Sequence, residues 1–506
     1  MQLVAYGAQD VYLTGNPQIT FFKVVYRRHT NFACEAIEQT FNGTPALGGR
    51  ATVPITRNGD LVTKMWLKTK IATSDTITKV QTGADSSDFY ILGAGTAVSV
   101  AAGGVTTDLS FANTAAGKVT VTADAGAGLT DAAFPAGSVV VVTNTNDLYN
   151  GNYKVDAVTG NNNTVVLLAI DDGTNTSAGN TGAAALANDT DAVLTVHTAA
   201  ETFNWGTDVG YSLIKNVELQ IGGTKIDKHY GRWMHIWSQL TRTSGLDNSH
   251  EQMIAPEIST TNSHELYVPL QFFCCRNDGL ALPLIALQYH DVRLEFEFTS
   301  GQDTVKNLEA DGTVGSKGGN VSISNTSLLV NYIYLDSEER KRFAQASHEY
   351  LIEQLQFTGV ETISGTSNKV RLNFNHPVKE LVWAAEKSAD NLNHFDFTNG
   401  SSANPVSNAL LQLNGHDRFS QETGKFFNYV QTHTHHSRTP SAGINVYSFA
   451  LNPEEHQPSG TCNFSRIDNA TLTVTTASAG TSMYVYGVNY NVLRIMSGMG
   501  GVAYSN

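Results

Sequence analysis

Alternating apolar and polar residues, with a period of two, form the most frequent pattern along the chain. Residues 291–298 show it most clearly, because four apolar side chains would face one way and three charged ones the other: Val292, Leu294, Phe296 and Phe298 against Arg293, Glu295 and Glu297. Residues 61–71, 328–335 and 483–495 repeat the pattern, and residues 18–26 are rich in β-branched and aromatic types. The pattern predicts antiparallel strands with one solvent-facing side, and more of them than a single sheet would hold.

Few segments have the periodicity of a helix. Residues 336–353 are the longest candidate, with Asp336 in the N-cap position and Glu339 three residues later, as in a capping box. Residues 231–241 and 424–432 are shorter candidates, and each opens with glycine followed by a basic residue. We therefore expect an all-β fold with short helices.

One pattern occurs twice, far apart in the sequence. Leu219-Gln220-Ile221-Gly222-Gly223 precedes the first short helix candidate, and Leu411-Gln412-Leu413-Asn414-Gly415 precedes the second. The flanking strands keep the same order. Segments 62–70 and 291–298 stand before and after the first copy, as segments 378–387 and 470–475 stand before and after the second. Two tandem β domains of one plan would explain this shared order.

The composition changes abruptly between residues 81 and 200. This window has two basic residues and eleven aspartates, which gives −9, and leaves −5 for the rest of the chain. Gly, Ala, Thr and Asn are abundant, so disorder is one interpretation. Against it, residues 138–143 and 164–170 read as strands, with a hairpin turn signal at 149–153. We predict a small β module inserted in a loop of the first domain.

The net charge of the chain argues against one class of binding partner, nucleic acid. The 506 residues carry a net charge of −14, whereas a protein that coats nucleic acid needs Lys and Arg to displace counterions. The longest basic cluster, Arg340-Lys341-Arg342, follows two glutamates and is interpreted as a solvated helix turn. We expect no direct contact with nucleic acid.

The cysteines and the apolar runs indicate the cellular compartment in which the protein folds. Cys34, Cys274, Cys275 and Cys462 are too few for a disulfide framework, and free, buried thiols fit a reducing environment. Residues 1–10 lack the basic and apolar regions of a secretory signal. No run of about 18 apolar residues could span a membrane. These features predict folding in the cytosol.

The search for an active site finds no strong motif. The sequence has no Walker A, HExxH or GxSxG pattern. The cluster His433-Thr434-His435-His436 is the best metal candidate, but its polar neighbours indicate an exposed loop. His290-Asp291 could orient a histidine for acid–base work, yet a structural hydrogen bond is the favoured interpretation. We predict no catalytic residue, no cofactor and no metal.

Nine Asn-x-Ser/Thr sequons occur in the chain. Four of them are kept as candidate glycan sites: Asn162, Asn175, Asn188 and Asn399. Because the chain is rich in Asn and Thr, many matches are coincidence, and a cytosolic protein would not meet the secretory glycosylation machinery.

Several long motifs occur along the chain outside the inserted window. The N-terminal motif runs from Gly7-Ala8-Gln9-Asp10 through Tyr12-Leu13-Thr14-Gly15-Asn16-Pro17 to Val25-Tyr26-Arg27-Arg28-His29. The most specific stretch is Tyr447-Ser448-Phe449-Ala450-Leu451 followed by Gln457-Pro458-Ser459-Gly460-Thr461-Cys462-Asn463-Phe464. Shorter motifs lie at Ile221-Gly222-Gly223, Val268-Pro269-Leu270, Ala281-Leu282-Pro283-Leu284 and Leu413-Asn414-Gly415. Together these motifs resemble one family, the major capsid proteins of nucleocytoplasmic large DNA viruses, and its algal-virus and mimivirus-like members in particular.

The resemblance implies two tandem eight-stranded antiparallel jelly rolls in one chain. The expected division is a first jelly roll over 1–336, interrupted by the inserted module at 81–204, a helical linker at 337–349 and a second jelly roll over 350–506. In the jelly-roll plan the insert lies between the fourth and fifth strands, and the resemblance implies that it faces the virion exterior as an acidic turret.

The resemblance also implies an assembly. Three chains would form a homotrimer with a pseudo-hexagonal outline, and such capsomers would tile an icosahedral outer shell above an internal membrane. Minor capsid or cement proteins and a penton protein would be the other partners. The protein would be made in the host cytoplasm and assembled in viral factories. The alternative is a β-sandwich that binds carbohydrate at a surface, and an enzyme ranks third because no catalytic constellation was found.

Overall fold

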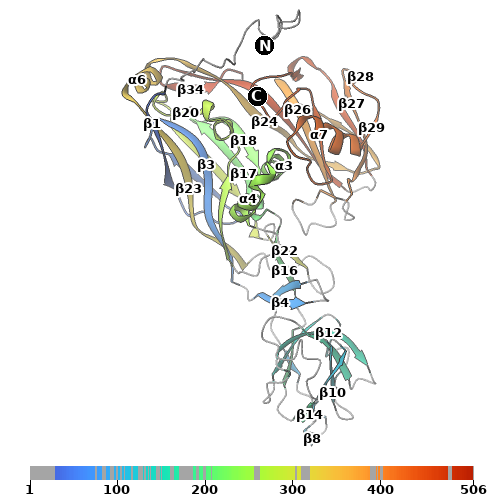
Figure 1. Ribbon diagram of the computed structural model, residues 1–506. Helices are drawn as coiled ribbons and strands as arrows, with labels where there is room; N and C mark the ends of the chain where they lie inside the picture. Colours follow the sequence, from blue (N-terminus) through green and yellow to red (C-terminus); the bar gives the residue numbers. More distant parts are fainter. Residues whose placement is uncertain are drawn as a thin grey trace, which may run out of the picture.

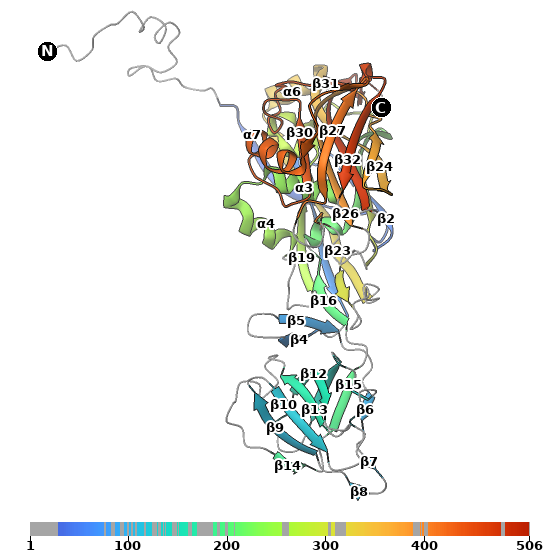
Figure 2. The ribbon, with the colours of Figure 1, turned by 90° about the vertical axis from the view of Figure 1, so that its right-hand side faces the viewer.

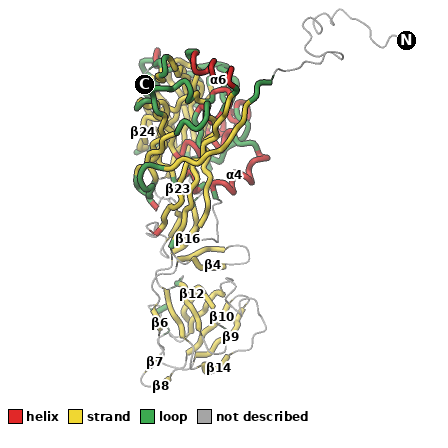
Figure 3. The backbone as a smooth tube through the Cα atoms, turned by 90° about the vertical axis from the view of Figure 1, so that its left-hand side faces the viewer, coloured by secondary structure: helices red, strands yellow, loops and turns green. Residues whose placement is uncertain are grey.

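The computed structural model of the chain describes the jelly-roll strands almost completely and the inserted window in part. The described residues are 29–74, 77–81, 87–91, 96–98, 101–102, 105–106, 109–115, 118–123, 129, 133–134, 136, 138–143, 149, 151–159, 164–169, 186–189, 193–197, 201–206, 208–255, 263–301, 305–308, 320–387, 395, 397–398, 403–476 and 481–504. Two β bodies lie side by side at one end of the molecule, and a third lies beyond them (Figure 1). Strands dominate over short helices (Figure 3), so the all-β expectation is confirmed.

The first jelly roll consists of two sheets whose pairings are all antiparallel. One sheet has the order β1 (Phe32–Thr40), β23 (Val321–Leu335), β3 (Leu61–Thr73) and β19 (Ser263–Pro269), with short β20 (Leu282–Pro283) beside β3. The other has the order β18 (Thr224–Tyr230), β17 (Ile214–Ile221), β21 (Val292–Phe298) and β2 (Arg50–Ile55). The predicted alternation is confirmed, since β21 buries Val292, Leu294, Phe296 and Phe298.

The second jelly roll repeats this strand order. Its first sheet contains β24 (His348–Ile363), β33 (Thr481–Met496), β26 (Pro377–Lys387) and β30 (Ile444–Ser448), with short β31 (Cys462–Asn463) and β34 (Met499–Val502). Its second sheet contains β25 (Ser367–Arg371), β32 (Ala470–Thr476), β27 (Val406–Leu413) and β28 (His416–Asp417), with β29 (Glu422–Thr423) beside β27. Each sheet corresponds strand by strand to one in the first jelly roll, so the predicted double jelly roll is confirmed.

The repeated sequence pattern marks equivalent turns. Gly222 and Gly223 connect β17 to β18 at φ values of 58° and 79°, and Asn414 and Gly415 connect β27 to β28 at 52° and 79°. Two consecutive residues with positive φ make the tight turn that matches the twist of a hairpin. The same backbone turn therefore ends the same strand in both jelly rolls.

Short helices connect the strands. In the first jelly roll they are α2 (Val209–Ser212), α3 (Gly231–Thr241), η1 (Ser244–Leu246), α4 (Asp247–Ile254), α5 (Phe273–Arg276) and η2 (Asp278–Leu280). In the second they are η5 (Phe426–Val430), α7 (Gln431–His435) and η6 (Phe464–Arg466), and helical structure begins at Gly424. Both short helices predicted after the repeated pattern are thus present, and the second continues to His435.

The connecting helix α6 (Ser337–Gln345) is shorter than predicted. Asp336 caps it, accepting a hydrogen bond from the Ser337 amide. The predicted helical continuation to residue 353 is wrong, because β24 begins at His348 and pairs with β33 along its length. Burial of Ile352 in the core outweighs the local helical pattern. No residue of α6 is buried, which agrees with a solvated turn at Arg340-Lys341-Arg342.

The inserted window folds into its own sheet. Eight strands have the order β14 (Leu186–Asp189), β9 (Leu109–Ala115), β10 (Lys118–Ala123), β13 (Thr164–Ala169), β12 (Gly151–Thr159), β11 (Val139–Thr143), β15 (Val193–His197) and β6 (Thr96–Val98). Their core includes Phe111, Phe134, Tyr149 and Tyr153 and shares no residue with the jelly-roll cores. The turn predicted at 149–153 is wrong, because Gly151 already pairs with Val142 inside the β11–β12 hairpin.

A small sheet lies between this module and the jelly rolls. It has the order β22 (Val305–Leu308), β16 (Glu201–Trp205), β5 (Ser87–Ile91) and β4 (Ile77–Gln81), and the pair β7 (Ala101–Ala102) and β8 (Val105–Thr106) lies at the far end of the molecule (Figure 2). Among the described residues the insertion follows the third strand of the first jelly roll and precedes the fourth. The strand predicted at 18–26 lies outside the described residues.

Candidate functional site

The contact between the two jelly rolls gathers most of the unusual side chains of the molecule. Along β26, the side chains of Leu381, Trp383 and Ala385 enter the core of the second jelly roll, while those of Val382 and Ala384 belong to the same buried cluster as the first jelly roll's interior. The outer face of the β24–β33–β26–β30 sheet is therefore buried against the first jelly roll. A single apolar cluster joins the two bodies.

Helix α3 covers this outer face. The ring of Trp233 lies 5.3 Å from that of Tyr486 on β33. Arg232 makes an ion pair of 2.8 Å with Glu386 on β26, and its guanidinium lies 4.2 Å from the centre of the Tyr484 ring. Burial dominates at Tyr484 and raises the pKa of its hydroxyl. Aromatic packing with a paired arginine makes this a specific contact as well as an apolar one.

Hydrogen bonds join strands of the two bodies directly. The backbone amide of Leu355 on β24 donates to the Asp227 carboxylate on β18 over 3.1 Å, and the side-chain amide of Gln354 donates to the carbonyl of Ile226. The other Asp227 oxygen lies 2.8 Å from Nε2 of His229. Because these groups are all buried, breaking the contact would leave them without partners.

A buried charge cluster lies in the same interface. Glu353 on β24 is 2.7 Å from Lys379 on β26, 3.1 Å from Arg276 of α5 and 4.0 Å from His456. A register shift between Val378 and Glu380 marks a bulge in β26. Buried charges are tolerated only where each has a counter-ion, and the cluster supplies one for Lys379.

His436 forms a second ionic centre. Its Nε2 lies 3.1 Å from Glu380 on β26 and its Nδ1 lies 3.0 Å from Glu454, and its side chain has no exposed surface. Burial by itself would lower the pKa of His436, but hydrogen bonds to the two glutamates and their charges outweigh it and raise the pKa to about 9. The same contacts hold the pKa of Glu454 below its usual range despite burial. The histidine is therefore a cation that joins two segments.

This geometry corrects the interpretation of the histidine cluster. The loop predicted there as exposed and polar is instead the end of α7, where Thr432 is fully buried. His433 is exposed, His435 bonds to the Leu451 carbonyl and His436 pairs with Glu380, so the three rings do not share one binding partner. No group of three or more potential metal ligands occurs within the part of the chain that the structure describes.

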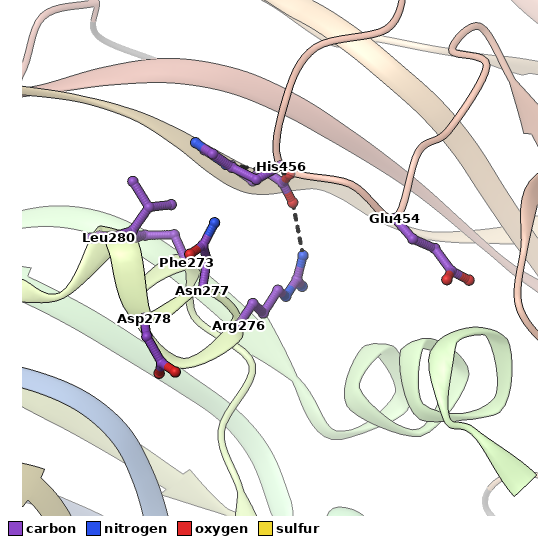
Figure 4. A pocket seen from close by; sticks show the side chains of 8 residues that line it. Phe273, Arg276, Asn277, Asp278, Leu280, Glu454 and His456 are labelled. Atoms are coloured by element: carbon purple, nitrogen blue, oxygen red, sulfur yellow. Dashed lines mark hydrogen bonds and ion pairs between the residues drawn. The ribbon is translucent and has the colours of Figure 1, made fainter. Parts of the chain in front are cut away.

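A pocket of about 370 Å³ opens beside the charge cluster. Eight residues line it: Phe273, Arg276, Asn277, Asp278, Leu280, Glu353, Glu454 and His456. Figure 4 shows Asp278 and Glu454 on opposite sides of Arg276. Glu353 and Glu454 at this pocket already have cationic partners, Lys379 and His436.

The other residues selected from the sequence either make structural contacts or lie outside the described residues. Nδ1 of His290 lies 3.0 Å from the carbonyl oxygen of Gly500, which confirms a structural contact. All four cysteines are free; Cys274 is buried, Cys275 and Cys462 are partly buried and Cys34 is exposed, so burial was predicted wrongly for Cys34. Asn188 lies in β14, and three candidate glycan sites lie outside the described residues: Asn162, Asn175 and Asn399.

The sequence did not identify Glu353, Lys379 and Glu380 as members of a buried ionic interface. The signal was present in β26, where a lysine and a glutamate interrupt a strand that is otherwise apolar through Trp383. Their partners could not be read from the sequence, since Arg276 and His436 are distant along the chain. Within the described ranges, no helix has both the length and the hydropathy to cross a bilayer.

Comparison with known proteins decides the family. The family model for the large eukaryotic DNA virus major capsid protein matches residues 339–501, and the model for the N-terminus of major capsid proteins matches 20–98 and 184–336. The major capsid protein of Pyramimonas orientalis virus is 40% identical, over 100% of this chain and 99% of its own length. The chain belongs to the major capsid proteins of large eukaryotic DNA viruses.

The relationship of this major capsid protein extends to solved structures. The major capsid protein of Paramecium bursaria Chlorella virus 1 is 34% identical over the whole chain. A chain of the PBCV-1 virus capsid matches with a TM-score of 0.61 at 30% identity, covering 96% of this chain and all of that one. Members of this family are structural proteins and not enzymes, so the prediction that the chain has no catalytic function is confirmed.

Proposed function

We propose that this capsid protein assembles into homotrimeric, pseudo-hexagonal capsomers that tile the icosahedral shell of a large double-stranded DNA virus. The observation that supports this best is the repeated strand order of two jelly rolls joined through one buried core. Three such chains bring together six similar bodies, and a closed three-fold oligomer of nearly six-fold outline fits a hexagonal lattice.

The mass and outline of the purified protein test this proposal. Light scattering after size exclusion should give three times the chain mass of 54.5 kDa, about 164 kDa. Negative-stain electron microscopy should show particles with a hexagonal outline. A monomer of 54.5 kDa at micromolar concentration would contradict the proposal, and a monomer that also binds sugars would favour the carbohydrate-binding alternative.

The finer assignments follow from the same assembly. The partners are other copies of the chain, minor capsid or cement proteins and a penton protein, with the internal membrane close by. Synthesis is in the host cytoplasm, assembly in viral factories, and the final location is the outer shell of the virion. The supporting observation is family membership, and cross-linking of purified virions followed by mass spectrometry tests each partner.

The division of the chain is part of the proposal. The first jelly roll spans 1–336, the module at 81–204 interrupts it, residues 337–349 form the helical linker, and the second jelly roll spans 350–506. The separate core of the module supports an outward-facing acidic turret. Limited proteolysis of assembled particles should cut within 81–204 first, and full protection of this window would contradict the outward position.

A further inference from the structure

The outer faces of the two equivalent sheets have different surroundings. In the second jelly roll this face carries Val382, Ala384, Tyr484, Tyr486 and Val488, and all of them are buried by the first jelly roll. The covering element is α3, which begins at Gly231. The first jelly roll has the same sheet, and among the described residues no element covers its outer face.

Apolar residues nevertheless line that uncovered face. Residues opposite each other on antiparallel strands lie on the same side of a sheet. Trp66 pairs with Leu329, and Leu329, Ile333 and Leu335 on β23 pair with Glu38, Cys34 and Phe32 on β1. None of these residues is buried, and Phe32 is 56% exposed. A row of half-exposed apolar side chains on a sheet face is typical of a surface that a partner covers.

The second jelly roll presents an uncovered helix at the position equivalent to α3. Counted from the opening glycines, Arg232 corresponds to Lys425, Ile236 to Tyr429 and Trp237 to Val430. Ile236 and Trp237 are buried, whereas Tyr429 and Val430 are each 51% exposed. Leu451 is also exposed, and its carbonyl bonds to His435 at the end of α7. This helical surface has the residue types of a covering element, and it covers no element in the part of the chain that the structure describes.

From this asymmetry we infer that the helix surface around Tyr429, Val430 and Leu451 of one copy packs on the outer β1–β23–β3 face of a second copy. The inference rests on the proposed trimer and names its contact surfaces. Each chain has one uncovered helix surface and one uncovered sheet face, and they lie at opposite sides of the molecule (Figure 1). A heterologous contact of this kind joins copies head to tail, and it forms a closed ring when the rotation between copies is a whole fraction of a turn, as in the proposed trimer.

The intrachain contact supplies the template for the contact between copies. Within the chain, the helix of the first jelly roll covers the sheet of the second, through Trp233 against Tyr486. Between copies, the helix of the second jelly roll would cover the sheet of the first. Three copies then contain three contacts of each kind, which alternate around six jelly rolls. Lys425 would occupy the place of Arg232, whose partner is a carboxylate on the covered sheet.

Two single substitutions and a matched control test the inference. Val430→Asp places a charge on the helix surface, and Phe32→Asp places one on the sheet face; both residues are about half exposed, so the chain should still fold. Each should reduce the trimer fraction at least tenfold in light scattering at equal concentration. Val360→Asp, at a residue 52% exposed on β24, should leave the trimer unchanged.

Mixing the two disrupted variants tests the head-to-tail arrangement. The Val430→Asp chain keeps its sheet face and the Phe32→Asp chain keeps its helix surface, so one intact contact can form between them. The mixture should contain a dimer of about 109 kDa, twice the chain mass of 54.5 kDa, that neither variant forms alone. A mixture that stays monomeric while the single variants are disrupted would contradict a head-to-tail contact.

Thiol labelling provides an independent readout. Cys34 is exposed in the chain and lies on the sheet face opposite Ile333, so it should react with iodoacetamide at least tenfold more slowly in the wild-type trimer than in the Val430→Asp monomer. Cys462 should react equally in both. If the wild type is a trimer but both aspartate variants remain trimers, the inference is wrong and the proposed function stands. If the wild type is a monomer, the proposed function itself fails.

Discussion

A lysine–glutamate pair joins corresponding strands in each of the two jelly rolls, near opposite ends of those strands. Lys68 on β3 lies 2.6 Å from Glu38 on β1, and Lys379 on β26 lies 2.7 Å from Glu353 on β24. The strands correspond in their sheets, yet the Lys68 side chain is 29% exposed and that of Lys379 is 0% exposed. Both pairs join the same two strands of the shared plan, but only the pair in the second jelly roll is covered by the first jelly roll and therefore buried.

The difference shows where the stability of the molecule depends on charge. A solvated pair is screened by water and contributes little. A buried pair is costly to separate, because removal of one partner leaves the other charged and desolvated. The interface between the jelly rolls therefore holds the two bodies in one arrangement, whereas no described element covers the outer β1–β23–β3 face.

The largest predicted effect breaks the buried pair. Glu353→Ala should lower the free energy of unfolding by about 3–5 kcal/mol, because Lys379 would remain in the interface without its closest counter-ion. Glu38→Ala, at the exposed pair on the corresponding strands, is the matched control and should leave the free energy of unfolding unchanged within experimental error. Urea denaturation followed by tryptophan fluorescence measures both. Equal losses in the two variants would show that burial does not distinguish the pairs.

The next effect concerns the glycines that open the equivalent helices. A Cβ atom at Gly231 would lie 2.1 Å from the carbonyl oxygen of Tyr211, and one at Gly424 would lie 2.1 Å from that of Val406. Both are backbone contacts, so Gly231→Ala and Gly424→Ala should each cost about 1–3 kcal/mol of stability. Gly245→Ala, where a Cβ meets nothing, should change the stability little. If alanine is tolerated at only one of the two sites, the two glycines do not have the same structural role in the two jelly rolls.

The third effect depends on pH. The pKa of His436 is raised to about 9 in the folded protein, against about 6.5 in the unfolded chain. The stabilising contribution is therefore complete below pH 6.5 and is lost as the pH rises through 9. His436→Gln should lower the melting temperature at pH 6 and have a smaller effect at pH 10. Calorimetry at the two pH values measures this, and an effect that is the same at both would rule out a charged His436.

Much of the fold could be predicted from local sequence pattern. The alternation in β21 and the exact bounds of α3 depend on residues that are close in the chain, and their periodicity is visible directly. The repeated turn was visible because Gly222-Gly223 and Asn414-Gly415 need positive φ values that few other residues adopt.

The errors arose where distant pairing decides the structure. Residues 348–353 continue a helical pattern but pair with β33, which lies more than a hundred residues later. His436 was interpreted as part of an exposed loop because Glu380 and Glu454 approach it only in the folded chain. The interface residues were missed for the same reason, since their burial is a property of the packed jelly rolls and not of β26 alone.

The smallest predicted effect separates the inserted module from the jelly rolls. Ile91 and Glu201 are opposite each other on β5 and β16, so replacing residues 92–200 with Asn-Gly would join two paired strands through a tight turn. Because the module core shares no residue with the other two cores, the melting temperature of the jelly rolls should change by less than about 2 °C. Differential scanning calorimetry should show the jelly-roll transition retained, and light scattering should show the proposed trimer retained. A large loss of either would mean that the module, like the interface, supports the arrangement of the jelly rolls.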